Sequence, residues 1–373
     1  MFRRFLFLCC IALLSACATP KQFAYIETAE SKVWPPPPLA PRYQFMGYLE
    51  GETNLVSAQA ETHYVRDFFS FLLGVVFGDE EPLKLERPYS GYVDSDQQRI
   101  YVADGQGRKV IVFDVNKNQV LNWQNSSEYL GFVTPVGIAK GANDTLLVSD
   151  AGLGVIVILD QSGDPVGRID HVLLERPAGI VRHAKSGLIF VADTPRHVIR
   201  VFNDQGELLR TIGKKGDQAL QFNSPTHLAL HNDELYVSDT LNSRIQVLGV
   251  DGKYRREFGK RGLYLGNMPR PKGVAVDPEG RIYVVESYYD YLLVYDAQGR
   301  PLLPIGGSGR GAGQFNLPSG VWTDDAGKIY VADMFNNRVA VFQYIFEDTI
   351  NSDRDILQKS IPLKIGTQSK VFH

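Results

Sequence analysis

Six acidic residues recur at a regular spacing, and each ends a short apolar run such as Ile-Tyr-Val-Ala-Asp at 329–333. The acids are Asp104, Asp150, Asp193, Asp239, Glu286 and Asp333. Carboxylates gathered in a ring could hold a hard cation such as Ca²⁺. An acid at the end of a strand can also accept hydrogen bonds from backbone N–H groups of the adjoining loop. Because the acid recurs in every unit, we favour a repeated structural role.

Basic residues follow some of these acids at a fixed distance. Five positions after the acid, three of the six units carry Lys109, Arg244 or Arg338. We expect an ion pair there that ties down the loop or links neighbouring units. The histidines are scattered, with no His-x-His or metalloprotease pattern, so the sequence predicts no metal, cofactor or catalytic residue.

A long repeat must position these residues. Proline opens each unit, and successive prolines lie 42 to 48 residues apart, at Pro88, Pro135, Pro177, Pro225, Pro271 and Pro318. Each unit holds four short runs rich in β-branched and aromatic residues, separated by Gly, Pro, Asn and Asp. Four strands per unit at this period form a propeller blade. The sequence therefore predicts an all-β fold, a six-bladed β-propeller of four-stranded antiparallel blades, in which the first two strands are the most buried and the outer two more polar.

The repeated text resembles a known family. Pro-x-Gly-Val-Ala-Val-Asp at 271–277, with Ile-Tyr-Val-Ala-Asp and Asn-Asn-Arg-Val at 329–339, is similar to the NHL repeat, over roughly residues 88–346. The resemblance implies the propeller fold and indicates little about activity, because NHL propellers include many binding proteins and few enzymes.

The propeller is expected to span residues 43–346. The sixth unit lacks a clear fourth strand, and residues 43–51 look like the missing one, so we expect them to close the ring there. The insertion 52–86 contains an apolar stretch, 65–78, too short to cross a membrane. It is expected to form a helix packed on the propeller, or else an exposed element that docks on a membrane or partner.

The N-terminus is typical of an exported lipoprotein. Arg3 and Arg4 precede an apolar run at 5–14, which indicates a signal peptide over residues 1–16. The text Leu-Ser-Ala-Cys ending at Cys17 resembles the bacterial lipobox, which implies a lipidated (palmitate-bearing) cysteine. Ala18 after the cysteine favours the outer membrane, with the protein facing the periplasm or the cell surface.

The parts that flank the propeller are expected to be extended. Residues 17–42 include Pro35 to Pro38 and are predicted to form a semi-rigid tether, and residues 347–373 a polar tail. The net charge of −3 and the predicted export argue against nucleic acid as a partner.

Two candidate sites follow from the blade pattern. His227 takes the place of Gly in the Pro-x-Gly text of four other units, at the innermost strand, which makes it a candidate for lining the central channel. Loops between second and third strands share a face with the connectors between blades, and this face gathers aromatic and basic residues. The candidate binding face there comprises Tyr288, Tyr289, Tyr291, Met334, Phe335, Arg244 and Arg338, near Lys214, Lys215, Lys260, Arg261 and Arg310.

The sequence predicts a lipid-anchored scaffold of the cell envelope that binds a protein or an extracellular polymer. The alternative is a metal-dependent hydrolase or lyase that resembles propeller lactonases or NHL-type lyases. Such an enzyme needs acids, amides or histidines clustered in the channel, and we find no such cluster in the sequence.

Overall fold

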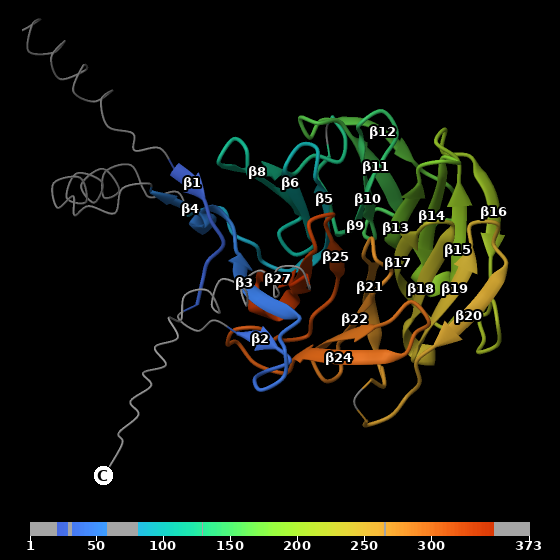
Figure 1. The fold of residues 1–373 in the computed structure, drawn as a ribbon. Helices are drawn as coiled ribbons and strands as arrows, with labels where there is room; N and C mark the ends of the chain where they lie inside the picture. Colours follow the sequence, from blue (N-terminus) through green and yellow to red (C-terminus); the bar gives the residue numbers. More distant parts are fainter. Residues whose placement is uncertain (1–20, 29–31, 58–80, 129, 265, 347–373) are drawn as a thin grey trace, which may run out of the picture.

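A computed structural model describes residues 21–28, 32–57, 81–128, 130–264 and 266–346. Six sheets lie side by side around a common axis, as the repeat predicts (Figure 1). Each of the first five blades is a four-stranded antiparallel meander in sequence order from the axis outwards. Among the described residues, no helix has the length and apolar character that crossing a membrane requires.

The blades follow one another along the chain. Blade one holds β5 (Pro88–Asp94), β6 (Arg99–Asp104), β7 (Lys109–Asp114) and β8 (Gln119–Trp123). Blade two holds β9 (Pro135–Lys140), β10 (Leu146–Asp150), β11 (Val155–Leu159) and β12 (Pro165–Ile169). Blade three holds β13 (Pro177–His183), β14 (Leu188–Asp193), β15 (Val198–Phe202) and β16 (Leu208–Ile212).

The remaining blades complete the ring. Blade four holds β17 (Pro225–His231), β18 (Glu234–Asp239), β19 (Arg244–Gly249) and β20 (Tyr254–Phe258). Blade five holds β21 (Pro271–Val276), β22 (Ile282–Glu286), β23 (Tyr291–Tyr295) and β24 (Pro301–Gly306). Blade six begins with β25 (Val321–Thr323), β26 (Lys328–Asp333) and β27 (Arg338–Tyr344). The 3₁₀ turns η2 (Thr194–Arg196), η3 (Thr240–Asn242) and η4 (Met334–Asn336) follow the second strands of blades three, four and six.

Burial is deepest in the middle of each blade. Every residue of β6, β7, β10 and β19 is buried, whereas β16 and β20 on the rim each bury only their last residue and expose several others. The expectation that third strands become polar is therefore wrong. A third strand lies between the second and fourth strands of its own sheet, and the flanking blades cover both of its faces, so both sets of side chains enter the core.

The N-terminal part of the propeller closes the ring, as predicted. β3 (Tyr43–Leu49) pairs antiparallel with β27, from Tyr43 opposite Tyr344 to Leu49 opposite Val339, and so supplies the fourth strand of blade six. A further strand, β2 (Val33–Trp34), pairs with the outer edge of β3 and makes this sheet five-stranded.

The tether prediction needs a correction, because part of residues 17–42 belongs to the folded unit. Trp34 is buried and packs edge-on against Phe342, with ring centroids 5.5 Å apart. The Lys32 ammonium donates a hydrogen bond to the Ala312 carbonyl at 3.0 Å. β1 (Lys21–Phe23) pairs with β4 (Leu55–Ser57) beside the propeller, and η1 (Glu52–Asn54) precedes β4 (Figure 1).

Other expectations fall outside the described residues. These are the signal peptide at 1–16, the lipidated Cys17 with Ala18, the apolar stretch 65–78 and the tail 347–373.

Candidate functional site

The six acids that end the second strands hold the connectors in place. Asp104 accepts hydrogen bonds from the backbone N–H groups of Glu86 and Arg87, each at 2.7 Å, in the chain that leads into blade one. In each of the other five blades, the corresponding acid accepts a hydrogen bond from at least one backbone N–H group of the connector that leads into that blade. Each acid is buried, and burial raises the pKa of Asp104 above its usual value, while these N–H groups oppose that shift. The structural role predicted for the ring of acids is confirmed.

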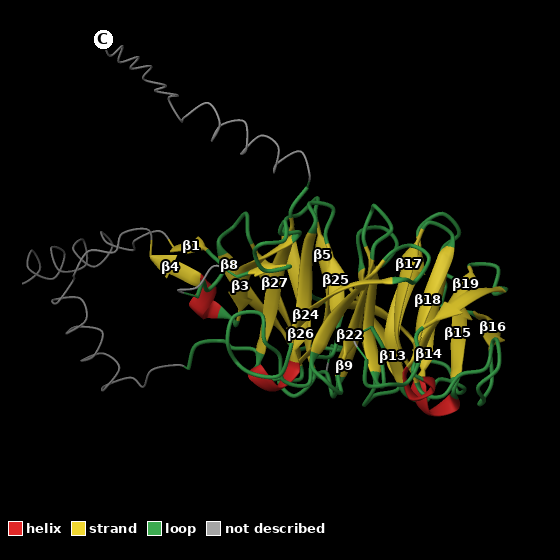
Figure 2. Ribbon diagram, turned by 60° about the horizontal axis from the view of Figure 1, so that its bottom comes forward, coloured by secondary structure: helices red, strands yellow, loops and turns green. Residues whose placement is uncertain are grey.

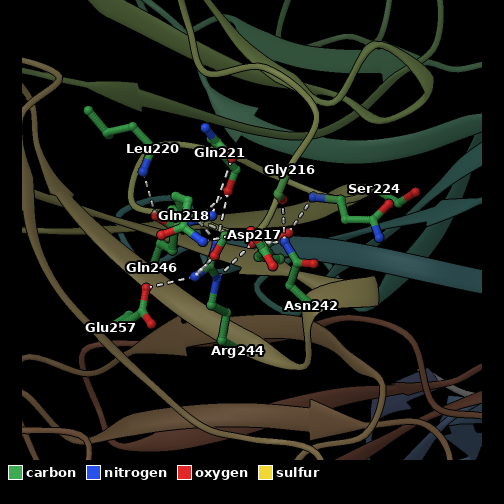
Figure 3. Close-up of polar contacts among 12 residues, drawn as sticks. Gly216, Asp217, Gln218, Leu220, Gln221, Ser224, Asn242, Arg244, Gln246 and Glu257 are labelled. Carbon is green, nitrogen blue, oxygen red and sulfur yellow. Dashed lines mark hydrogen bonds and ion pairs between the residues drawn. The ribbon is translucent and has the colours of Figure 1, made fainter.

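Arg244 shows how the basic partners work. Its guanidinium bonds the Asp239 carboxylate at 2.9 Å and donates to the carbonyls of Asp217, Gln218 and Gln221 in the connector between blades three and four (Figure 3). It also contacts Glu257 on β20 at 2.9 Å. One buried side chain thus joins the second strand, the rim strand and the connector.

Of the other two predicted ion pairs, the one between Arg338 and Asp333 forms and the one between Lys109 and Asp104 does not. Arg338 bonds Asp333 at 2.8 Å and donates to the Gln314 carbonyl, and its guanidinium lies 3.6 Å from the Tyr48 ring centroid on β3. Lys109 pairs instead with Glu86 of the connector at 3.0 Å.

Three residues of the candidate binding face are corrected by these contacts. Arg244 and Arg338 are each only 7% exposed because their guanidinium groups hold connectors inside the fold. Met334 is also 7% exposed, since it starts η4 facing inwards. None of the three offers its side chain to a partner on the surface.

Part of the remaining face forms a groove. Tyr288 and Tyr289 line it, and their rings meet edge to face at 4.8 Å. The groove lies on the face that carries the loops between the second and third strands of each blade (the 2–3 loops), and this face points downwards in Figure 2. Its complete lining is Leu241, Arg261, Gly262, Leu263, Pro269, Arg270, Tyr288 and Tyr289. We call this the blade 4/5 groove.

Besides the tyrosines named from the sequence, the groove exposes Leu263, which the sequence analysis did not single out. Leu263 is 85% exposed and its neighbour Tyr264 84%, in the connector between blades four and five, and Tyr288 is 64% exposed. The run Leu-Tyr-Leu at 263–265 in this connector was the available signal. Tyr291 is half-buried on β23, and Phe335 lies by blade one, with the Arg87 guanidinium 4.9 Å from its ring centroid. Neither of them lines the groove.

The first strands surround a central channel, and His227 lines it, as the sequence predicts. Two cavities open along the axis, and His227 borders both. Burial and the charge of Lys272 lower the pKa of His227 to about 3, which the nearby Tyr89 backbone offsets only in part. Tyr89 belongs to blade one, opposite blade four, so the imidazole reaches across the channel. Within the described ranges, no three His, Cys, Asp or Glu side chains gather as a metal site.

Comparisons with known proteins agree with the architecture. A family model described as a 6-bladed beta-propeller matches residues 274–360. The Protein brain tumor of Drosophila melanogaster is 30% identical over 126 residues, which take in 33% of this chain and only 12% of that protein. The chain therefore spans a small fraction of this relative's length.

Two solved structures share the fold at low identity. Virginiamycin B lyase from Staphylococcus aureus has a TM-score of 0.52 and 14% identity, over 70% of this chain and 98% of the lyase. An auxiliary nutrient binding protein from Bacteroides thetaiotaomicron has a TM-score of 0.55 and 14% identity, over 70% and 69%. One is named as an enzyme and the other as a binding protein, so the likeness extends to the fold alone. The chain is a six-bladed β-propeller whose repeats are similar to NHL repeats.

Proposed function

We propose that this protein is a lipid-anchored binding module of the cell envelope, and that it captures a protein partner in the blade 4/5 groove. The observation that carries the proposal is the exposure of Leu263 and Tyr288 in the lining of one concave site. Exposed apolar surface of this kind marks interaction sites on soluble domains. Tyrosine and arginine are the residue types that contribute most at interface centres, and Arg261 borders the same groove.

The rest of the same face supports a recognition role. Glu286 accepts hydrogen bonds from the backbone N–H groups of Arg270, Tyr288 and Tyr289, so these three lining residues are held in place before any partner arrives. Loops held in one conformation lose less entropy on binding than loose ones. β22, which ends at Glu286, therefore presents this part of the groove on a rigid support.

The membrane anchor rests on the sequence alone. Arg3 and Arg4, the apolar run at 5–14 and the text Leu-Ser-Ala-Cys at 14–17 together support acylation of Cys17. A Cys17→Ala chain should leave the membrane fraction and should lack labelled fatty acid after growth with labelled palmitate. Acyl label on the Cys17→Ala chain, or an unlabelled parent protein, would contradict the anchor and leave the groove proposal intact.

The alternative activity is that of a metal-dependent hydrolase or lyase. The fold supports it only to the extent that the similar structures include a lyase and a gluconolactonase, each at low identity. Metal analysis of the purified protein separates the two functions: a stoichiometric divalent ion would favour the enzyme.

The groove is tested by paired surface variants. Leu263→Ser with Tyr288→Ser removes the exposed apolar surface of the groove, whereas Leu209→Ser with Tyr254→Ser removes exposed side chains of the rim strands β16 and β20. Affinity capture from native envelope, read by mass spectrometry, should lose the partner in the first pair only. Retention of the partner by both pairs would refute the groove, and recovery of a polysaccharide in place of a protein would change the partner class.

A further inference from the structure

The central channel contains polar groups that no neighbouring side chain satisfies. Both ring nitrogens of His227 are buried, and although the Tyr89 backbone lies near the ring, no group among the described residues meets hydrogen-bond geometry with either nitrogen. Unpaired buried polar atoms are costly, and native proteins keep few of them without a reason. A ligand that accepts a hydrogen bond at this point would remove the cost.

The cavity on the 2–3 loop face brings a cation to the same place. Lys272 lines this cavity beside His227, and neither a carboxylate nor a hydrogen bond is found for its ammonium within the described part of the chain. Burial, together with the charge of Arg270, lowers the pKa of Lys272 below its usual value. Lys272 is half-buried, and an ammonium held partly away from water without a partner gains from an anion beside it.

The other polar residues that line this cavity are cationic or neutral. Arg176 borders the cavity, and Thr134 and Ser319 contribute hydroxyl groups. No Asp or Glu is among the residues that line it. The site thus combines cations and neutral hydrogen-bonding groups without the negative charge that would repel an anion.

We propose that this cavity binds a small oxyanion, a carboxylate or phosphate group, between the Lys272 ammonium and the His227 imidazole. The neutral ring donates its N–H to one oxygen, and the ammonium bonds another. Charge-assisted bonds of this kind are about twice as strong as neutral ones. The site is separate from the blade 4/5 groove, so it stands whether or not a protein partner binds there.

Calorimetric titration of the full chain in detergent, at constant ionic strength set with chloride, tests the site. Citrate and inorganic phosphate are the two probes. The unmodified protein should bind at least one of them, and Lys272→Met should weaken binding by about tenfold or more. Lys253→Met, the same change at an exposed position in the turn between β19 and β20, should leave binding unaltered.

The choice of anion identifies the ligand chemistry. Binding of both probes indicates a general oxyanion site, and binding of citrate alone indicates a carboxylate ligand. His227→Phe keeps an aromatic ring and removes the N–H, so it should also weaken binding. Equal affinities for the unmodified protein and Lys272→Met, or no binding of either anion to the unmodified protein, would overturn the proposal.

Discussion

Arg244 joins three stretches of chain through one guanidinium group, and its removal should be correspondingly costly. Arg244→Met would leave the Asp239 carboxylate buried with one partner fewer and would take one donor from each of three connector carbonyls, two of which keep another donor. Breaking a buried ion pair from one side costs about 3–5 kcal/mol. We expect the free energy of unfolding to fall by about that amount, measured by urea denaturation.

A matched substitution provides the control for Arg244→Met. Arg255 forms an exposed pair with Asp251 one strand away, at 3.4 Å. Exposed pairs contribute about 0–1 kcal/mol, so Arg255→Met should have little effect. Equal losses from the two variants would mean that Arg244 does not hold the connector.

Because of His227, we expect the free energy of unfolding to decrease in acid. Its pKa in the folded protein is lowered from 6.5 to about 3, so the folded state keeps a neutral ring where the unfolded chain takes up a proton. Stability from this group is complete above pH 6.5 and declines as the pH falls from 6.5 towards 3. Between about pH 7.5 and about pH 5 the unmodified protein should lose about 2 kcal/mol more than His227→Phe.

The comparison of the two proteins isolates the histidine. Buried acids such as Glu286 and Asp333, whose pKa values are raised by burial, contribute equally to both. Urea unfolding at the two pH values measures the difference. The same pH dependence in both proteins would show that the ring is hydrated or paired in solution.

Repetition is what made single residues predictable. The acids recur in every unit, so a structural role followed from the sequence, and His227 stood out because it breaks a pattern of glycines. The burial of the Arg244, Arg338 and Met334 side chains could not be predicted from the sequence. Whether a side chain near a loop points to solvent or packs under a connector depends on the neighbouring blade. In blade three the basic partner of Asp193 is Arg200, seven positions on, where spacing alone gave no signal.

At the scale of elements, β3 closes the ring by joining the two ends of the propeller. Deletion of residues 43–51 would expose the edge of β27 and remove the contacts of Tyr43, Phe45 and Tyr48 with blades five and six. We expect a sharply lower melting temperature by circular dichroism. An unchanged melting temperature would mean that blade six is stable with three strands.

A second prediction at this scale concerns the added strand β2, which contains Trp34. Trp34 is 8% exposed and packs among Phe342, Phe315 and Tyr43, so Trp34→Ala should cost about 3–5 kcal/mol of unfolding free energy. Leu39→Ala in the same segment alters an exposed side chain and should cost little. If 32–42 were a free spacer, both variants would unfold like the unmodified protein.

The sequence predicted the first of these elements and missed the second for the same physical reason. A missing fourth strand in the last repeat indicates a closing strand elsewhere, because an open sheet edge is unfavourable. Consecutive prolines, by contrast, favour an extended spacer in the absence of a tertiary partner. The hydrophobic gain from burying Trp34 beside Phe342 overrides that local preference.

For the molecule as a whole, the ring of blades creates one face on which connectors and 2–3 loops meet. The repeat period and strand content were enough to predict that ring. The sequence analysis reached this groove only through its tyrosines and Arg261, because Leu241, in a loop of blade four, and Leu263, in the connector to blade five, become neighbours only when the sheets are arranged radially. Our central claim is that this groove is where a partner binds.

Site-specific photo-cross-linking in the native envelope tests that claim most directly. A photoreactive side chain at position 288 should give one discrete cross-linked protein, and Leu263→Ser in the same chain should abolish it. The same group at position 254, on the rim strand β20, should give none. Identical products from positions 288 and 254, or a product at 288 that survives Leu263→Ser, would contradict the account.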